Sequence, residues 1–487
     1  MKKLLLCLAT AAICAPSQAK LPLRIYSGDK DTVYSAEHTI VGVTLPGAHA
    51  TIAGTEAKVY DHTGSFGAKI HLKKGRNKVK ISAANGKQKA DTTLNIYLAD
   101  KRASSPAAAK EPKQETVFIG AITVATDSGA YLQYGPAGDR LGGSKMCFLD
   151  RDIRLTATGE IGALYKVRLS ENRYAYLPKE YAHAVEGSAP ASPVTTGSWS
   201  ITRNDRTDRV CVGLPARLPY TYWTEDNDPS SLCIDLFGAC DNSNWITQRS
   251  LDLGIIDRVD FRQVESDVYR IIIRLKSAYV WGFTVGYEGN TLCINVRHAP
   301  EVDGLKGLHV GLDAGHGGKY PGARSPSGLL EKDLNLDIIL KLRDMLTKAG
   351  AKVTLTRDGD TGPSMTERKR ILRDAGVDIS VSVHNNSGGG ALAAPGTAAL
   401  YKHSFDRPLA LAIARRLLEL DVNLFGLVGN FNFSLNGPTD YPNMLVEGLF
   451  MSSLEEENLL ADPEFRTRMA RAIFLGLEDY MKAALTK

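Results

Sequence analysis

The stretch Leu308-His-Val-Gly-Leu-Asp-Ala-Gly-His-Gly-Gly318 decides the fold expected for the C-terminal part of the chain. It begins as a short apolar strand and ends in a glycine-rich turn, so that Asp313 and His316 directly follow the strand. Beyond residue 302, segments of this kind alternate with helical segments, and such repeated βα units predict a mostly parallel sheet flanked by helices. Chemistry in these folds gathers at the carboxyl ends of the strands.

The elements of this expected α/β domain, residues 303–487, follow from hydrophobic periodicity and capping residues. Gly350 and Gly376 are expected to close the first two helices, because glycine readily adopts the left-handed conformation that ends a helix. The strands are expected at 308–312, 352–356, 378–383, 397–401 and 444–446, and the helices at 333–348, 364–374, 408–420 and 463–484.

Two histidines and two carboxylates fall where the strand ends of this sheet can gather them. His316 and His384 each follow a strand, Glu447 ends a later one, and Glu331 opens the first long helix. Two neutral imidazoles and one carboxylate are a standard ligand set for catalytic zinc, which lowers the pKa of a bound water to roughly 7. A second carboxylate can then take the proton of the water and return it to the leaving amine. A zinc-activated water and a carboxylate that transfers its proton can together hydrolyse an amide bond.

Six strings between residues 306 and 484 are similar, in their order, to the zinc-dependent N-acetylmuramoyl-L-alanine amidases of the amidase 3 group. They are Asp313-Ala-Gly-His-Gly-Gly318, Gly328-Leu-Leu-Glu-Lys332, Thr354-Leu-Thr-Arg-Asp-Gly-Asp360, Met365-Thr-Glu-Arg368, Ser380-Val-Ser-Val-His-Asn-Asn386, and Leu445-Val-Glu-Gly-Leu-Phe450 followed by Glu455-Glu-Glu-Asn-Leu-Leu460.

This resemblance implies a role for each residue of the cluster. It implies that His316, Glu331 and His384 bind one zinc ion per catalytic domain and that Glu447 is the catalytic acid/base. It also implies cleavage of the amide that joins the lactyl group of muramic acid to the L-alanine of the peptide stem. Peptidoglycan is therefore the expected substrate.

Each site residue also has a structural alternative. Glu331 suits the first turn of a helix because the helix dipole favours a negative charge there. His384 could be a hydrogen-bonded histidine at a strand end. Glu447 could be a buried carboxylate paired with Arg357 or Arg368, and we interpret both arginines as structural partners of acidic groups.

Other parts of the expected catalytic domain refine this picture. The short segment 387–395 predicts that the helical plug of some division-associated relatives is absent. The polar loop 425–441, which contains Asn432 and Asn436, is hypothesised to line the substrate groove. We assign His309 and His403 to no metal site, because one lies within a strand and the other has no companion ligand.

The N-terminus predicts export through a cleavable signal peptide, residues 1–19. Two lysines precede an apolar run from Leu4 to Cys14, and small residues lead to an expected cleavage after Ala19. A lipoprotein anchor at Cys14 is the alternative, which Ile13 disfavours because such sites need a small residue there. The expected location is thus periplasmic or extracellular. The apolar run is too short to span a bilayer of roughly 30 Å, and no transmembrane segment is expected later.

Three β modules are expected between the signal peptide and the catalytic domain. Alternating apolar positions at Val41/Val43/Leu45, Val79/Ile81 and Leu94/Ile96/Leu98 suit an immunoglobulin-like sandwich. The second module resembles a bacterial SH3-like barrel through Leu164-Tyr-Lys-Val-Arg-Leu169, and the third resembles the wall-targeting modules that precede amidase domains in Gram-negative bacteria. The expected boundaries are 20–100, 116–186 and 199–302 for the modules, with linkers at 101–115 and 187–198.

The cysteines and tryptophans of the β modules are interpreted as core residues. Stacking on sugar rings is the alternative for Trp223, Trp245 and Trp281. Cys233 and Cys293 lie in similar strand-like strings that would permit neighbouring strands, so a disulfide stays open. The five cysteines beyond the expected cleavage site are Cys147, Cys211, Cys233, Cys240 and Cys293.

Composition narrows the function further. The 487 residues carry 59 basic and 54 acidic side chains, a formal net charge of +5, without the basic cluster that nucleic acid binding requires. The leading hypothesis is an exported zinc amidase that acts on peptidoglycan, with room for a partner protein of the wall or the cell division machinery. The alternatives are a non-catalytic wall-binding or activator protein, and a zinc peptidase that cuts within the stem peptide.

Overall fold

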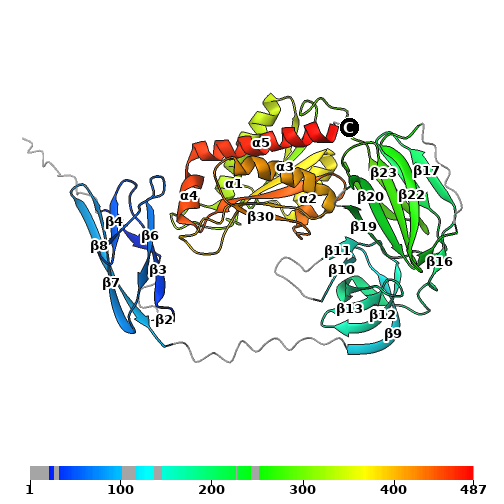
Figure 1. Ribbon diagram of the computed structural model, residues 1–487, viewed down its shortest axis with the longest axis horizontal. Helices are drawn as coiled ribbons and strands as arrows, with labels where there is room; N and C mark the ends of the chain where they lie inside the picture. Colours follow the sequence, from blue (N-terminus) through cyan, green and yellow to red (C-terminus); the bar gives the residue numbers. More distant parts are fainter. Residues whose placement is uncertain are drawn as a thin grey trace, which may run out of the picture. The chain divides into compact units, whose positions relative to one another are not determined.

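The computed structural model describes residues 21–26, 32–100, 117–136, 145–225, 228–242 and 252–485 (Figure 1). The chain forms two compact units, Met1–Ala103 and Ser104–Lys487. The expected signal peptide, the linker 101–115 and Trp245 lie outside the described residues. Among the described helices, none is both long enough and apolar enough to cross a membrane.

The first unit contains two β-sheets, with one larger apolar cluster and a second small one at Leu21, Ala83 and Ala90. Strands β7 (Gly75–Asn85) and β8 (Gln88–Leu98) form a hairpin that turns after Asn85, where Gly86 has a φ of 58°. The first sheet pairs β1 (Arg24–Ile25), β3 (Glu37–Val43) and β6 (Ser65–His71). The second has the order β2 (Thr32–Val33), β8 (Gln88–Leu98), β7 (Gly75–Asn85), β4 (His49–Ile52) and β5 (Thr55–Ala57).

The buried face of β3 differs from the expected one. Ile40 is fully buried, whereas Leu45, expected on the inner face, is 38% exposed. The reason is the ring of Phe66, which would lie only 2.5 Å from a Cβ at Gly42. A large side chain on the facing strand thus fills the space opposite a glycine, and the inward positions shift by one residue.

The second β block, residues 117–184, is one seven-stranded antiparallel sheet. Its strands lie in the order β11-β10-β14-β13-β12-β9-β15. Their bounds are β9 (Val117–Thr126), β10 (Tyr131–Gln133), β11 (Lys145–Phe148), β12 (Arg154–Ile161), β13 (Leu164–Arg168), β14 (Tyr174–Pro178) and β15 (Ala182–Ala184), with a 3-10 turn at Lys179–Tyr181.

The third β block, residues 194–297, contains two four-stranded antiparallel sheets and a short parallel pair. One sheet has the order β17 (Trp199–Arg203), β18 (Thr207–Val212), β25 (Thr291–Arg297) and β24 (Phe283–Glu288). The other has the order β19 (Tyr220–Glu225), β20 (Asp228–Phe237), β23 (Val268–Leu275) and β22 (Ile256–Glu265), and the pair is β16 (Val194–Thr195) with β21 (Ala239–Cys240).

Two tryptophans of the third block lie in different environments. Trp281 is 1% exposed, as expected for a core residue. Trp223 is only half-buried, and the guanidinium of Arg270 lies 4.6 Å from the centre of its ring. The core interpretation therefore holds for Trp281 and not for Trp223, whose ring stacks on a cation.

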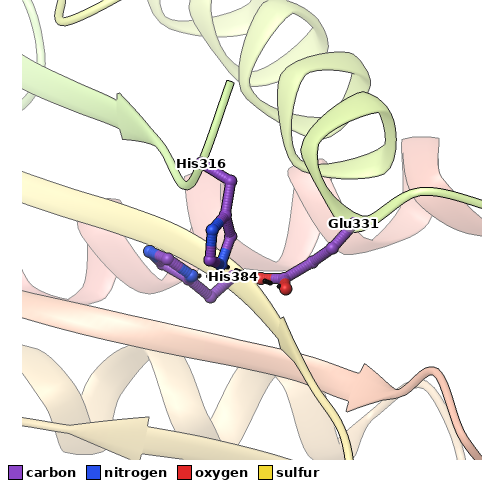
Figure 2. Close-up of side chains that lie close together, drawn as sticks. All are labelled: His316, Glu331 and His384. Carbon is purple, nitrogen blue, oxygen red and sulfur yellow. Dashed lines mark hydrogen bonds and ion pairs between the residues drawn. The ribbon is translucent and has the colours of Figure 1, made fainter. Parts of the chain in front are cut away.

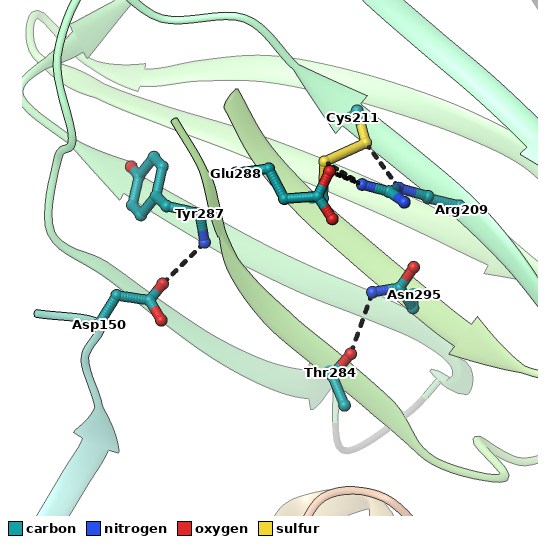
Figure 3. The surroundings of a disulfide bond; sticks show 8 residues. Asp150, Arg209, Cys211, Thr284, Tyr287, Glu288 and Asn295 are labelled. Carbon is teal, nitrogen blue, oxygen red and sulfur yellow. Dashed lines mark hydrogen bonds and ion pairs between the residues drawn. A yellow bond between two sulfur atoms is a disulfide. The ribbon is translucent and has the colours of Figure 1, made fainter. Parts of the chain in front are cut away.

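A disulfide joins two neighbouring strands of the third block (Figure 3). Cys211 of β18 and Cys293 of β25 are directly opposed in register, and the bond connects them. The guanidinium of Arg209 donates to both sulfurs, at 3.1 and 3.2 Å, and forms an ion pair with Glu288. The interpretation of all five cysteines as unlinked core residues is therefore wrong for this pair. Cys233 lies on β20 of the other sheet, so its strand does not pair with the strand of Cys293.

Thiol counting tests this linkage. In protein prepared without residues 1–19 and kept oxidised, we expect three reactive thiols after denaturation, from Cys147, Cys233 and Cys240, and five after reduction. Labelling followed by peptide mapping should recover Cys211 and Cys293 only in the reduced sample. Five reactive thiols in the unreduced sample would contradict the bond.

The C-terminal α/β part, residues 308–485, is built on a six-stranded sheet. Its order is β27-β26-β28-β31-β29-β30, and neighbours are parallel except β29 and β31. The strands are β26 (His309–Ala314), β27 (Lys352–Leu355), β28 (Ile379–Asn386), β29 (Thr397–Leu400), β30 (Leu424–Val428) and β31 (Asn443–Phe450). The helices are α1 (Glu331–Lys348), α2 (Met365–Ala375), α3 (Arg407–Leu418), α4 (Leu454–Ala461) and α5 (Pro463–Leu485).

Periodicity does not predict two of these elements, β30 and α4. Strand β30 lies at the edge of the sheet, and its central Gly426 weakens the strand pattern. Helix α4 has only eight residues, but the sequence contains a signal for its start. Ser453 caps it by accepting a hydrogen bond from the Glu456 backbone at 3.3 Å, and a serine followed three residues later by glutamate is a helix-start signal.

The second and third β blocks share a continuous apolar core with the α/β part. This core runs from Val124 to Ala484 and crosses the linker expected at 187–198. Hydrogen bonds also join these blocks to one another. The carboxylate of Asp150 accepts a hydrogen bond from the Tyr287 backbone at 2.8 Å (Figure 3). The domain boundaries expected inside this unit stay predictions.

Candidate functional site

Three of the four predicted site residues converge at one edge of the α/β sheet (Figure 2). His316 lies in the turn after β26, Glu331 is the first residue of α1, and His384 lies in β28. The Glu331 carboxylate bridges the histidines, with Oε2 3.1 Å from Nε2 of His316 and Oε1 3.0 Å from Nδ1 of His384. One ligand atom from each residue lies within 4.8 Å of the others. The geometry is that of a three-ligand cation site.

Glycines make the space into which these side chains point. A Cβ at Gly315 would come within 2.4 Å of the His384 ring, and a Cβ at Gly322 would lie 2.3 Å from Oε2 of Glu331. His316 itself has a φ of 62°, a left-handed conformation that few non-glycine residues adopt. The turn is thus shaped around the three side chains, and strain of this kind clusters at functional sites.

A buried ion pair fixes the turn that carries His316. Asp313, fully buried, accepts a hydrogen bond from Arg368 at 2.7 Å. Arg368 also donates to the carbonyls of Ala314 and His316, at 2.8 and 2.6 Å. Arg357 differs from the expectation, because its guanidinium donates to backbone carbonyls rather than to a carboxylate. Both arginines hold the backbone of the site.

Electrostatics keep Glu331 ionised. Burial would raise the pKa of Glu331, but its hydrogen bonds to His316 and His384 outweigh burial and hold the pKa well below the usual range. The same carboxylate accepts hydrogen bonds from the backbone of Ala323 at 2.8 Å and from the side chain of Asn335 at 3.3 Å. A charged carboxylate next to two imidazoles is suited to a divalent cation.

Asn335 and Asn385 belong to the site but escaped the sequence interpretation. The Asn385 backbone donates to Glu331 at 3.2 Å, and its side chain donates to the Asn335 side chain at 2.8 Å. The sequence positions of Asn335 and Asn385 relative to the predicted ligands would have identified both residues. Asn385 follows His384 directly, and Asn335 lies four residues after Glu331, on the same helix face.

Glu447 lies beside the three-residue cluster on the next strand. Strand β31 places it in register with His384 of β28. It is 8% exposed, and its buried Oε2 has no hydrogen-bond partner among the described residues. Burial raises the pKa of Glu447 to about 7, and the negative charge of Glu331 acts in the same direction. The alternative of a pair with Arg357 or Arg368 is wrong, because both guanidinium groups are engaged elsewhere.

The loop 425–441 reaches the site through a residue that the sequence interpretation missed. The ring of Phe433 stacks on His384, with 6.0 Å between ring centres. Asn432 accepts a hydrogen bond from Lys402 at 2.7 Å. Asn436 is 1% exposed and donates to the Leu400 carbonyl at 3.3 Å, which is a structural role rather than a place in a groove.

Two histidines lie apart from the cluster, as the sequence indicated. His309 lies inside β26 and contacts the Thr354 hydroxyl at 2.8 Å. His403 contacts the Gly437 carbonyl at 2.9 Å, and burial lowers its pKa to about 4. Both rings are hydrogen-bonded within the fold.

Comparison with known proteins places this site in context. A family model described as N-acetylmuramoyl-L-alanine amidase (Amidase_3) matches residues 310–479. The probable cell wall amidase LytH of Staphylococcus aureus is 31% identical over 209 residues, which cover 42% of this chain and 68% of LytH. The amidase AmiC of Neisseria meningitidis serogroup B is 28% identical over 367 residues, covering 57% of this chain and 88% of AmiC.

Other matches cover a smaller share of this chain. The match to the amidase LytC of Bacillus subtilis, 28% identical, spans 40% of this chain and 40% of LytC. Among solved structures, the catalytic domain of CwlV from Paenibacillus polymyxa is 29% identical, with a TM-score of 0.35, and covers 36% of this chain and 99% of that domain.

Proposed function

The chain belongs to the Amidase_3 family of N-acetylmuramoyl-L-alanine amidases, and we propose that it is an exported zinc enzyme that cleaves the amide between N-acetylmuramic acid and the L-alanine of the peptide stem. The observation that carries the proposal is the convergence of His316, Glu331 and His384 beside the unpaired carboxylate of Glu447. A metal site that activates water and an acid/base group of suitable pKa can together hydrolyse an unactivated amide.

The residues present fit a zinc ion. Two imidazoles and one carboxylate offer ligand atoms within 4.8 Å of one another, and glycines at positions 315 and 322 leave the space between them clear. Zinc held there would supply a Lewis acid and an activated water. His316, Glu331 and His384 are the proposed ligands, one ion per domain.

Glu447 is the proposed acid/base. Its pKa of about 7 allows the carboxyl group to accept a proton and to donate one at neutral pH. Oε2 of Glu447 is available for that exchange, because it has no hydrogen-bond partner among the described residues. The group would accept the proton of the attacking water and deliver it to the nitrogen of the leaving L-alanine.

The remainder of the chain is proposed to deliver this enzyme to the wall. We assign the three β blocks to an immunoglobulin-like domain, an SH3-like barrel and an amidase-associated wall-targeting module, ahead of a mostly parallel α/β domain. The disulfide between Cys211 and Cys293 supports export, because such bonds persist in oxidising compartments. Peptidoglycan is the proposed partner, together with a wall or cell division protein.

Digestion of purified sacculi tests the function. With zinc present, the mature protein should release intact stem peptides that begin with a free L-alanine, identified by mass spectrometry. Peptides that begin at another residue would indicate a peptidase cutting within the stem. Sedimentation with sacculi without release of peptides would indicate a wall-binding protein. Either result would contradict the proposed reaction.

A further inference from the structure

A groove lies against the residues that directly follow Phe433. It has a volume of about 390 Å³ and lies between helix α2, the loop 434–441 and Phe148 of β11. Ser434 lines the groove and directly follows Phe433, whose ring stacks on His384. The groove therefore begins one residue away from a side chain that packs on a proposed metal ligand.

The charged side chains that line this groove are mostly basic. Helix α2 contributes Lys369, Arg370 and Arg373, against the one carboxylate of Asp440. Arg370 and Arg373 share Asp374 in exposed pairs of 3.4 Å, which neutralise little of their charge. Lys369 has no ion pair among the described residues. An excess of positive charge in a concave surface attracts anions.

Two further lysines extend this basic surface towards Phe433. A small neighbouring cavity of about 50 Å³ contains Lys145 and Lys402 and shares Phe148, Ser434 and Gly437 with the groove. The Lys402 ammonium donates to the Lys145 carbonyl and, at 2.7 Å, to Asn432.

These lysines come from separate parts of the chain and repel one another. Burial lowers the pKa of Lys145, and the charge of Lys369 lowers it further. Burial also lowers the pKa of Lys402 to about 8, with Lys145 acting in the same direction. In the described ranges, no ion pair joins Lys145, Lys369 or Lys402 to an acidic side chain. Positive charges that outnumber the carboxylates around them favour a bound anion.

We propose that this basic groove, lined by Lys369, Arg370 and Arg373, binds the free carboxylates of the stem peptide beyond the scissile amide. The proposal rests on the function proposed above. In that substrate the lactyl carboxyl of the sugar is consumed in the amide, so the carboxylates lie on the peptide side. A peptide leaving the site along Phe433 and Ser434 would advance about 3.3–3.6 Å per residue and bring its carboxylates into the groove.

Binding of a free peptide tests the groove without requiring turnover. The probe is the synthetic tripeptide N-acetyl-L-alanyl-D-glutamyl-D-alanine, which has two free carboxylates, and its neutral counterpart has both amidated. We expect the mature Lys369→Gln/Arg373→Gln protein to bind the tripeptide about tenfold more weakly than the wild type, and the wild type to lose affinity at high salt. The neutral tripeptide should bind both proteins equally weakly.

A matched control removes two charges elsewhere on the α/β part. Lys348→Gln/Arg471→Gln changes exposed residues of α1 and α5 outside the groove, and should retain the wild-type affinity. Equal thermal unfolding temperatures would show that all three proteins are folded. The same affinity for the tripeptide in the wild type and in the Lys369→Gln/Arg373→Gln protein, or no preference for the charged tripeptide over the neutral one, would overturn the proposal.

Hydrolysis of a muropeptide by the same proteins separates this inference from the proposed function. Groove-dependent binding of the tripeptide without release of stem peptides would leave the groove in place and refute the amidase reaction. Normal release by the wild type with an affinity unaffected by the two substitutions would refute the groove and leave the reaction in place.

Discussion

Replacing Glu447 by glutamine is expected to lower kcat on muropeptides by at least ~100-fold, the low end for loss of a general acid/base, while zinc binding is retained. Glutamine has nearly the same shape as glutamate but cannot take a proton from the water or return it to the leaving nitrogen. Glu447 is not one of the three residues whose ligand atoms cluster, so its replacement leaves the proposed metal site complete. Single-turnover rates and metal analysis of the purified variant measure the two effects separately.

A carboxylate on the exposed face of α4 provides the matched control. Glu455 is exposed and has no ion-pair partner in the described residues, so Glu455→Gln should retain wild-type kcat and zinc content. The orphaned Oε2 of Glu447 adds a check on folding. Removing a buried unpaired charge by substitution with a neutral amide should leave stability unchanged or raise it. An active Glu447→Gln protein would rule out the assigned role.

The sequence predicted the cluster because its signals are local. His316, His384 and Glu447 each stand at or near a strand end, and parallel strands present those ends at the same edge of a sheet. Helix α1 adds Glu331 through its first residue. The spacing of apolar residues was therefore enough to bring the four together, although β28 and β31 extend further than expected and include His384 and Glu447.

What escaped prediction depends on long-range packing. Phe433 reaches His384 from an irregular loop whose path depends on Lys402 and on the carbonyl of Lys145 in the second β block. Nothing near Phe433 in the sequence marks that contact. The disulfide is similar, because strands β18 and β25 are 82 residues apart at the bond and their register is set by the whole third block.

The hydrogen-bond partners of Arg357 and Arg368 were also only partly predictable from the sequence. Charge alone suggested that Arg357 and Arg368 balance acidic groups. Arg368 does so with Asp313, but Arg357 donates to the carbonyls of Ala314 and Gly315 and fixes the backbone of the turn. A guanidinium has five donors, and backbone carbonyls compete for them with carboxylates. Only the folded turn shows which acceptor is within reach.

Replacing His384 by alanine is expected to abolish detectable hydrolysis by weakening zinc affinity at least ~100-fold, since loss of an outer hydrogen-bond partner alone costs 10–100-fold. In the wild type, zinc should raise the unfolding temperature, because a ligand that binds only the folded state stabilises it. That rise should vanish in His384→Ala, a readout that does not depend on activity. Chelation should inactivate the wild type, and added zinc should restore it.

The control for this substitution is another histidine with a carboxylate partner. His183 of β15 is exposed and lies 3.1 Å from Asp127, away from the cluster. His183→Ala should therefore keep the zinc-dependent rise in unfolding temperature and the wild-type kcat. If His384→Ala still gained stability from zinc as the wild type does, the ion would bind elsewhere. The bridging geometry of Glu331 between His316 and His384 would then be an ordinary buried hydrogen-bond network, and the amidase chemistry would need another source of activated water.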